Sequence, residues 1–306
     1  MQTFGVTVIE APHALQSDDW LYRHPEARAD DLHWALTNPD VDGIVTTIGG
    51  DDSVRILRHL DLELIRSNPK VFIGFSDTTV QHVAFYLAGV TSFYGPSILT
   101  GFAENGGIFP YTTASLRSTL FGGDGRVSLT PADQWTEEHL DWSDPGLQLQ
   151  LRKLEPNPGW IWLQGGRRAQ GRLLGGCLEV LEMLKGTPWW PSLEHFDGAV
   201  LYLETSELAP PLDFVTYWLR NYVTQGIMER VSGLLLGRPQ GYTEPMKEEL
   251  YRRVKLVASE AGRGDMPIVA NMDFGHTSPT CVLPNGCRVA IDPFAGTIEV
   301  VESCVR

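Results

Sequence analysis

The stretch Lys70-Val71-Phe72-Ile73-Gly74-Phe75-Ser76-Asp77-Thr78-Thr79 passes from an apolar run into polar residues that favour the start of a helix. Residues 70–75 are typical of a buried strand. From Thr78 to Ala88 apolar residues recur at helical spacing, and Gly89 is typical of a residue that ends a helix. The sequence therefore predicts a strand and a helix that meet at Ser76.

Similar apolar runs recur along the chain and alternate with helix-like segments. Further strands are predicted at 42–48, 199–203, 233–236 and 267–271, and a further helix at 177–184. Strands that alternate with helices indicate an α/β fold with a mainly parallel sheet. The Asn285-Gly286 turn predicts a hairpin, and the run 296–301 predicts an antiparallel end to the chain.

The stretch 126–165 has a different composition, because Pro, Gly, Asp and Trp are mixed there with few strand signals. Its clearest signal is the strict alternation over 147–152, which predicts a half-buried strand. We interpret 126–165 as a connection between an N-terminal α/β domain, 1–125, and a C-terminal mixed α/β domain, 166–306.

The bulk composition excludes several classes of protein. The formal net charge of −14, from 38 acidic and 24 basic residues, argues against a nucleic-acid partner, which would need clustered Lys and Arg. No run approaches the roughly 18 apolar residues of a membrane span. The first residues lack the basic and apolar regions of an export signal, so we expect a cytoplasmic protein.

The four cysteines, at 177, 281, 287 and 304, form no C-x-x-C pair and have no His at zinc-ligand spacing. In a protein without an export signal, buried thiols are the better expectation. The sequence thus predicts no structural disulfide and no metal.

Polar residues follow four of the predicted strands, at the carboxyl ends where open α/β sheets present ligands. These segments are 49–53, 76–79, 204–207 and 273–277. Ser76 has the strand-to-helix setting of a nucleophile elbow, although its spacing is Gly-x-Ser-x-Thr instead of Gly-x-Ser-x-Gly. The alternative, a serine that only caps a helix, is the commoner use of such a position.

Glu204 and His276 are candidates to act with Ser76. Glu204 ends an apolar strand, where an acid needs either a salt bridge or a function. His276 follows a buried strand, in a place where a solvated histidine is also common. The order Ser, Glu, His matches that of another α/β scaffold. Gly49-Gly50 lacks a nucleotide-binding motif, and its backbone could instead face an oxyanion beside Ser76.

Several blocks in this order resemble the LD-carboxypeptidase family of serine peptidases, and in particular its microcin C immunity branch. The blocks are Asp31-Leu32-His33-Trp34-Ala35-Leu36, Asn38-Pro39-Asp40-Val41, Ile48-Gly49-Gly50-Asp51-Asp52-Ser53, Ile73-Gly74-Phe75-Ser76-Asp77-Thr78-Thr79, Tyr94-Gly95-Pro96, Gly171-Arg172-Leu173-Leu174-Gly175-Gly176-Cys177-Leu178, Leu203-Glu204 and Asn271-Met272-Asp273-Phe274-Gly275-His276-Thr277-Ser278-Pro279.

The resemblance implies a division of roles in which Ser76 is the nucleophile, His276 the general base and acid, and Glu204 the residue that orients the His. Backbone N–H groups near Gly50 and Asp77 would stabilise the oxyanion. The Ser would lie on the N-terminal domain and the Glu and His on the C-terminal domain, with the site in the cleft between them. Family members are commonly dimers, so a homodimer without metal or cofactor is expected.

The resemblance also implies two substrate classes. One branch cleaves the amide of aminoacyl or peptidyl adenylate-like compounds, and the other releases D-Ala from muropeptides. Residues 48–52 and 273–276 look more like the first branch. Trp160 and Trp162 could stack on a nucleobase or pack at the domain boundary, and Asp51 and Arg172 are further candidates for substrate contact.

The chain departs from the family at its start. The family usually opens with a strand and a helix before the segment that residues 4–9 resemble, whereas this sequence begins there. We expect an exposed sheet edge that a partner chain could cover. The departure leaves open a catalytically silent, ligand-binding relative.

Overall fold

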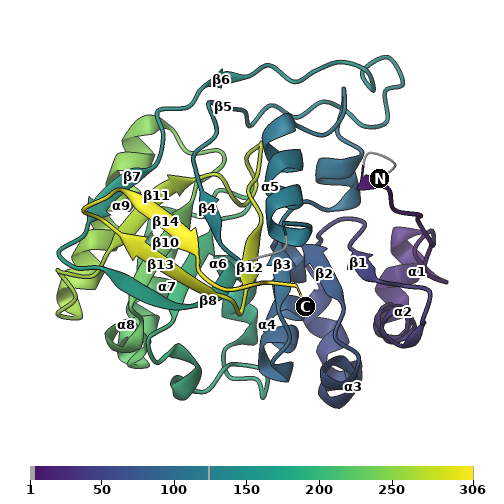
Figure 1. The fold of residues 1–306 in the computed structure, drawn as a ribbon, viewed down its shortest axis with the longest axis horizontal. Coiled ribbons are helices and arrows are strands. Elements are labelled where there is room, and N and C mark those ends of the chain that lie inside the picture. Colours follow the sequence, from purple (N-terminus) through teal and green to yellow (C-terminus); the bar gives the residue numbers. More distant parts are fainter. Residues whose placement is uncertain (1–3, 123–124, 306) are drawn as a thin grey trace.

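Two sheets organise the computed structural model, which describes residues 4–122 and 125–305. The first has four strands in the order β1-β2-β3-β12, and the second has eight in the order β4-β14-β13-β8-β9-β10-β11-β7. Strands β5 and β6 form a separate pair, and the segment that carries them runs along the top of the molecule in Figure 1. The mixed α/β fold predicted from the sequence is confirmed.

The four-stranded sheet is built mainly from the first third of the chain. Its first three strands are parallel and β12 runs antiparallel to β3. The strands are β1 (Gly43–Val45), β2 (Val71–Gly74), β3 (Ser92–Tyr94) and β12 (Leu283–Asn285); the helices of this part are α1 (Asp18–Arg23), α2 (Pro25–Thr37), α3 (Leu62–Ser67), α4 (Thr79–Ala88) and α5 (Pro110–Leu120), with short helical turns at Ser53–His59, Ser76–Thr78 and Ile98–Phe102.

The eight-stranded sheet has a parallel centre, β8-β9-β10-β11, and antiparallel strands on both sides of it. Its strands are β4 (Val127–Leu129), β7 (Ile161–Gln164), β8 (Ala169–Cys177), β9 (Val200–Glu204), β10 (Gly233–Gly237), β11 (Ile268–Met272), β13 (Arg288–Asp292) and β14 (Thr297–Val300). The helices are α6 (Leu178–Leu184), α7 (Leu212–Thr224), α8 (Ile227–Arg230) and α9 (Glu244–Glu260), the separate pair is β5 (Gln134–Trp135) and β6 (Glu155–Pro156), and a further turn lies at Leu193–Phe196.

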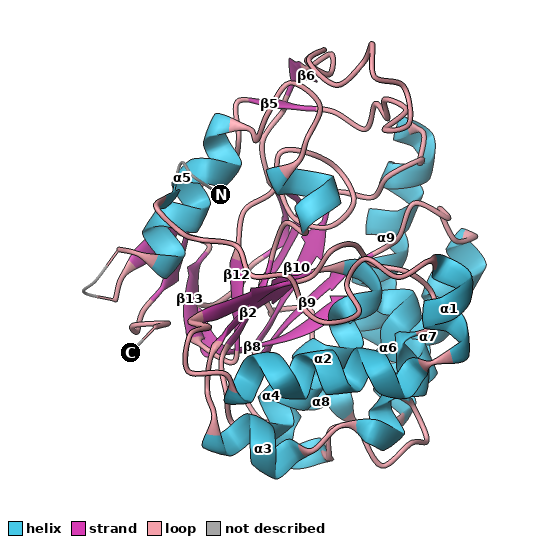
Figure 2. Ribbon diagram, turned by 90° about the vertical axis from the view of Figure 1, so that its right-hand side faces the viewer, coloured by secondary structure: helices cyan, strands magenta, loops and turns pink. Residues whose placement is uncertain are grey.

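The two sheets are joined by one hydrophobic core. Figure 2 shows the strands in the interior with α2, α4, α6 and α7 gathered along one side. Apolar residues of these helices belong to one buried cluster, in which Val80 and Val83 of α4 lie with Leu178 and Leu181 of α6. The start of α4 therefore has a fixed position relative to the second sheet.

A close contact between α4 and β8 fixes this position further. The Thr79 hydroxyl accepts a hydrogen bond from the Cys177 N–H at 2.9 Å. Gly176 has a φ of +144°, and a Cβ there would lie 2.4 Å from Thr79 Oγ1. Only a glycine lets β8 approach the helix this closely.

Two local predictions are wrong. Residues 147–152 form turns and loop instead of a strand, and Leu149 is 92% exposed. The alternation there has no neighbouring strand or core face to bury it. The predicted hairpin at Asn285-Gly286 does not form either, because β12 pairs with β3 and β13 pairs with β8 and β14. The chain crosses from one sheet to the other at that turn.

The interpreted connection, 126–165, supplies β4 and β7 to the eight-stranded sheet.

Residues 6–11 contain no helix or strand, and β1 is at the edge of its sheet. All four cysteines are free thiols. None of the helices in the described part of the chain is long and apolar enough to cross a membrane.

Candidate active site

Three side chains from different elements lie in one hydrogen-bonded line. Ser76 begins the turn between β2 and α4, Glu204 ends β9, and His276 lies in the loop after β11. Ser76 Oγ is 2.9 Å from His276 Nε2, and His276 Nδ1 is 2.7 Å from Glu204 Oε2. The convergence expected from the sequence is thus present, and it joins residues of both sheets.

The backbone of Ser76 is in an uncommon conformation. Its φ is +61°, in the left-handed region that residues other than glycine rarely adopt. The residue before it, Phe75, is extended, so the chain turns sharply at Ser76. Ser76 does not cap α4, because Thr78 holds that position. The geometry is that of a nucleophile elbow, in which strain presents the hydroxyl above the sheet.

The Gly49-Gly50 backbone lies directly against Ser76. A Cβ on Gly49 would be 3.0 Å from Ser76 Cβ and 3.2 Å from its Oγ. Asp77 Oδ2 accepts hydrogen bonds from the N–H groups of Asp52 and Ser53, at 3.2 and 2.9 Å, and so holds the glycine loop in place. Burial raises the pKa of Asp77. Gly49 therefore lies beside the Ser76 hydroxyl, and Gly50, one of the predicted oxyanion residues, lies beside the carboxylate of Asp77, the other one.

Tyr94 forms hydrogen bonds to both Ser76 and Glu204. Its hydroxyl donates to Glu204 Oε1 at 2.5 Å and accepts a hydrogen bond from the Ser76 N–H at 3.0 Å. Burial and then the charge of Glu204 raise the pKa of Tyr94 well above its ordinary value, so the hydroxyl stays a donor. Sequence reasoning missed this role, and the available signal was the position of Tyr94 at the carboxyl end of β3.

Glu204 and His276 approach each other because a glycine lies between them. Gly275 has a φ of +97°, and a Cβ there would be 2.7 Å from Glu204 Oε2. The Glu204 side chain has no exposed surface. A second acid, Glu207, places Oε2 3.0 Å from His276 Nε2. Burial alone would lower the pKa of His276, but Glu204 and then Glu207 raise it to about 10.

Asp273 anchors the loop that carries His276. It accepts hydrogen bonds from Arg238 Nη2 at 2.6 Å, from Trp160 Nε1 at 2.8 Å and from the Ala132 N–H at 3.0 Å. Asp273 and Arg238 are both almost completely buried. Trp160 and Trp162 also pack against a buried apolar cluster. These contacts favour the packing interpretation of the two tryptophans over stacking on a ligand.

Two other candidates have different surroundings. Arg172 lies in the first half of β8 and donates hydrogen bonds to the Gly286 carbonyl and to Glu302. At the other end of β8, Cys177 lies opposite Glu204 in the strand register. The structure therefore does not bring Arg172 to the three side chains. Asp51 is exposed in the loop next to Gly50, beside the glycine backbone that faces Ser76.

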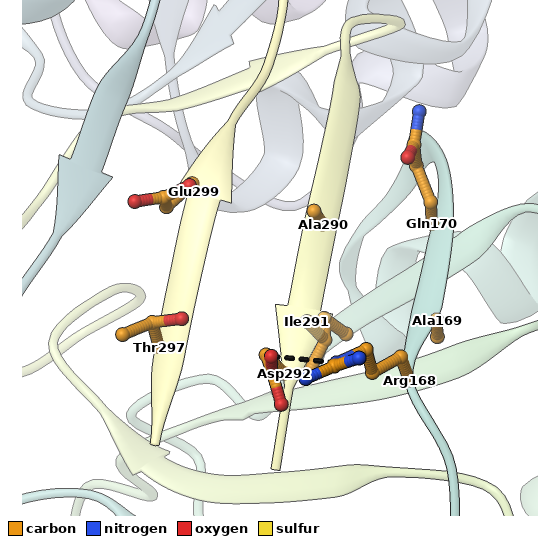
Figure 3. A pocket seen from close by; sticks show the side chains of 8 residues that line it. All are labelled: Arg168, Ala169, Gln170, Ala290, Ile291, Asp292, Thr297 and Glu299. Carbon is orange, nitrogen blue, oxygen red and sulfur yellow. Dashed lines mark hydrogen bonds and ion pairs between the residues drawn. The ribbon is translucent and has the colours of Figure 1, made fainter. Parts of the chain in front are cut away.

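One hollow on the described surface lies away from these side chains. It has a volume of about 340 Å³ and is lined by residues of β8, β13 and β14 with their neighbours. Figure 3 shows the Arg168–Asp292 ion pair at one end of it. None of Ser76, Glu204 and His276 lines this hollow. Among the described residues, no group of three or more His, Cys, Asp or Glu side chains could hold a metal ion.

Two family models match the chain. The LD-carboxypeptidase N-terminal domain matches residues 1–95, and the LD-carboxypeptidase C-terminal domain matches residues 170–291. The chain belongs to the LD-carboxypeptidase family. Ser76 falls in the first match, and Glu204 and His276 fall in the second. The resemblance described from the sequence is confirmed.

Relatives in this family carry names from both substrate branches. A putative carboxypeptidase of Bacillus subtilis, YocD, is 30% identical over 98% of this chain and 88% of its own. The microcin C7 self-immunity protein MccF of Escherichia coli is 30% identical over 90% of this chain and 78% of its own. The murein tetrapeptide carboxypeptidase of Pseudomonas aeruginosa is 26% identical over 87% of this chain and 78% of its own. Hydrolysis is therefore the class of reaction of this LD-carboxypeptidase family member.

Solved structures extend the similarity to the whole fold. An MccF-like protein from Streptococcus pneumoniae, in complex with AMP, has a TM-score of 0.87 and 30% identity, and the match covers 99% of this chain and 90% of that one. MccF in complex with aspartyl sulfamoyl adenosine has a TM-score of 0.85 and 26% identity, over 100% and 89%.

Proposed function

We propose that this LD-carboxypeptidase family member is a serine hydrolase that cleaves the amide bond of aminoacyl or peptidyl adenylate-like compounds. The observation that carries the proposal is the hydrogen-bonded line from Ser76 through His276 to Glu204. The substrate class is supported by the AMP and aspartyl sulfamoyl adenosine complexes of the similar structures. We also propose a homodimer, as the family resemblance implies, and a cytoplasmic location, as expected from the first residues of the sequence. Light scattering tests the assembly.

The mechanism follows from the geometry of the line. Ser76 Oγ attacks the carbonyl carbon while its proton passes to His276 Nε2. Glu204, bonded to Nδ1, stabilises the imidazolium that forms. The N–H groups of Gly50 and Asp77 stabilise the oxyanion. The C–N bond then breaks, and the Nε2 proton goes to the leaving nitrogen.

The acyl group is then bound to Ser76 as an ester. A water molecule attacks it and gives one proton to Nε2, and that proton returns to Ser76 Oγ as the ester bond breaks. The products are the free acid and the unchanged serine. Tyr94 holds the Ser76 backbone and Glu204 in their relative positions throughout these steps.

The second candidate is a murein tetrapeptide LD-carboxypeptidase that releases D-Ala. A relative with that name supports it. The chemistry at Ser76 would be the same, and the difference lies in the groups next to the scissile amide. A third possibility is a ligand-binding relative that does not turn over its ligand.

Mass spectrometry of the reaction products separates the three. The full chain and Ser76→Ala are incubated with an aminoacyl sulfamoyl-adenylate and, separately, with a muropeptide tetrapeptide. Cleavage of the adenylate that depends on Ser76 supports the proposed function. Release of D-Ala alone would assign the murein role, and cleavage of neither would favour the ligand-binding relative.

A further inference from the structure

Glu207 is an acid that the mechanism does not use, although it touches the reacting groups. Its Oε2 lies 3.0 Å from His276 Nε2, the atom that also contacts Ser76 Oγ at 2.9 Å. The Glu207 side chain is 59% exposed, whereas that of Glu204 is fully buried. Glu207 is therefore accessible from solvent beside Nε2, and Glu204 is not.

His276 Nε2 cannot exchange a proton with Ser76 while it is also hydrogen-bonded to Glu207. The nitrogen must receive the proton of Ser76 and then deliver it to the leaving group. A carboxylate bonded to Nε2 keeps the proton there, and this contact contributes to the raised pKa of His276. Productive binding of a substrate therefore requires that Glu207 find another partner.

The substrate itself can provide that partner. Attack by Ser76 places the carbonyl carbon about 3–3.5 Å from Oγ. In an aminoacyl group the α-nitrogen lies about 2.5 Å from that carbon by standard bond geometry. Because Oγ and the Glu207 carboxylate contact the same ring nitrogen, an ammonium group at the α-carbon comes within reach of Glu207.

We propose that Glu207 is a specificity-determining residue that binds the ammonium group next to the scissile carbonyl and so selects aminoacyl substrates with a free α-amino group. The ammonium replaces His276 as the partner of Glu207 and leaves Nε2 to Ser76. This inference rests on the proposed function, because it concerns the acyl part of an aminoacyl adenylate-like substrate.

The charges around the site favour a cation at this point. Glu179 of α6 accepts from the N–H and the hydroxyl of Ser206, at 2.8 and 2.7 Å, which fixes the residue before Glu207. Two arginines next to the site already pair with acids, Arg28 with Asp52 at 2.5 Å and Arg238 with Asp273 at 2.6 Å. Glu207, whose partner here is His276, has no arginine beside it in the described contacts, so it suits an ammonium better than the carboxylate of a peptide C-terminus.

The test compares two substrates, one with a charged α-nitrogen and one in which acetylation removes that charge. Alanyl sulfamoyl-adenosine and its N-acetyl form are hydrolysed by the full chain at pH 7, where the α-amino group is mostly charged. The readout is the ratio of the two kcat/KM values. We expect the wild-type chain to prefer the free amine about tenfold or more, the size of a charge-assisted hydrogen bond. Glu207→Gln should bring the ratio close to one.

Two control variants test whether a change in the ratio of kcat/KM values is specific to Glu207 and whether cleavage depends on Ser76. Glu248→Gln removes one charge from an exposed position of α9 and should keep the wild-type ratio. Ser76→Ala should cleave neither substrate. If the wild-type chain cleaves both substrates through Ser76 but shows no preference, or Glu207→Gln keeps the preference, the role of Glu207 is wrong and the proposed function stands. If the wild-type chain cleaves neither compound, both proposals fail.

Discussion

Ser76 is the residue on which the proposed chemistry depends most directly, because its hydroxyl contacts the histidine and its backbone is held in a left-handed turn. Ser76→Ala should lower kcat by about 10³-fold or more, as in other serine triads. The fold should persist, since alanine keeps the Cβ of serine and loses only the hydroxyl, so the strain of the turn does not change. Steady-state hydrolysis and a thermal unfolding curve measure both quantities. Hydrolysis at the wild-type rate by this variant would exclude Ser76 as the nucleophile.

Tyr94 is predicted to position the other groups. Tyr94→Phe removes the hydroxyl that joins the Ser76 N–H to Glu204, so kcat should fall by about 10- to 100-fold while KM changes less. Glu204 Oε1 also loses its buried donor, which should cost about 1–3 kcal/mol of stability. Kinetics and chemical denaturation test the two effects.

The matched control for Tyr94 is Tyr202. Its hydroxyl is also buried but has no hydrogen-bond partner within the described part of the chain. Tyr202→Phe should therefore leave both kcat and stability close to the wild-type values. Equal losses from the two variants would mean that any buried hydroxyl matters, and the bridging role of Tyr94 would be wrong.

The pH dependence of activity should show how far the carboxylates of Glu204 and Glu207 raise the pKa of His276. The imidazole must be neutral to act as a base, and its pKa of about 10 in the free chain keeps it protonated below that pH. For an N-acetyl substrate, kcat/KM should therefore rise as pH increases toward 10. Glu207→Gln removes one source of the raised pKa, so the rise should shift to lower pH. Profiles from pH 5 to about 10.5 test this, and an unshifted profile would show that Glu207 does not influence His276.

At the scale of elements, the contact between β8 and α4 decides where the two halves of the site meet. Gly176→Ala would place a Cβ 2.4 Å from Thr79 Oγ1, in a backbone conformation that alanine rarely adopts. The control Gly186→Ala has a φ of +79° but no atom within 4 Å of the new Cβ. Gly176→Ala should therefore destabilise the chain by about 1–3 kcal/mol more than the control. Urea denaturation of both variants measures the difference, and equal losses would show that the packing tolerates the extra carbon.

The elements also show what sequence patterns can and cannot predict. The strand at 70–75 and the helix after it form as predicted, because apolar periodicity and the terminal glycine act locally. The alternation at 147–152 fails, since a strand also needs a partner that the sequence does not reveal. The Asn285-Gly286 turn is real, but its two flanking strands belong to different sheets.

The residues of the candidate site also fall into two groups, those that the sequence predicts and those that it does not. Glu204 ends a strand and Ser76 and His276 follow strands, and the order of the blocks points to all three. Tyr94 and Glu207 contact the site through hydrogen bonds and an ion pair between distant parts of the chain, which no spacing in the sequence encodes. The sequence therefore predicts which strand ends meet, and the structure is needed to show which neighbours hold them.

At the scale of the whole molecule, Asp273 connects three regions. It binds Arg238 after β10 and lies in the loop that leads to His276. It also accepts hydrogen bonds from the Ala132 backbone N–H and the Trp160 indole N–H, both in the segment before β8. The buried ion pair therefore holds the connecting segment, the second sheet and the proposed base in one arrangement. Removing one partner of such a pair leaves the other charge buried without compensation.

Asp273→Ala should accordingly cost about 3–5 kcal/mol of stability. Activity should fall as well, because the His276 loop loses its anchor and the distance from Nε2 to Ser76 Oγ is no longer fixed. The control is Asp197→Ala, which breaks the exposed pair with Arg230 and should cost no more than about 1 kcal/mol. Denaturation curves and kcat at a temperature where both variants are folded measure the two effects. If Asp273→Ala lost stability but kept its kcat, Asp273 would act only on the fold, and the position of His276 would be set by Glu204 and Gly275 alone.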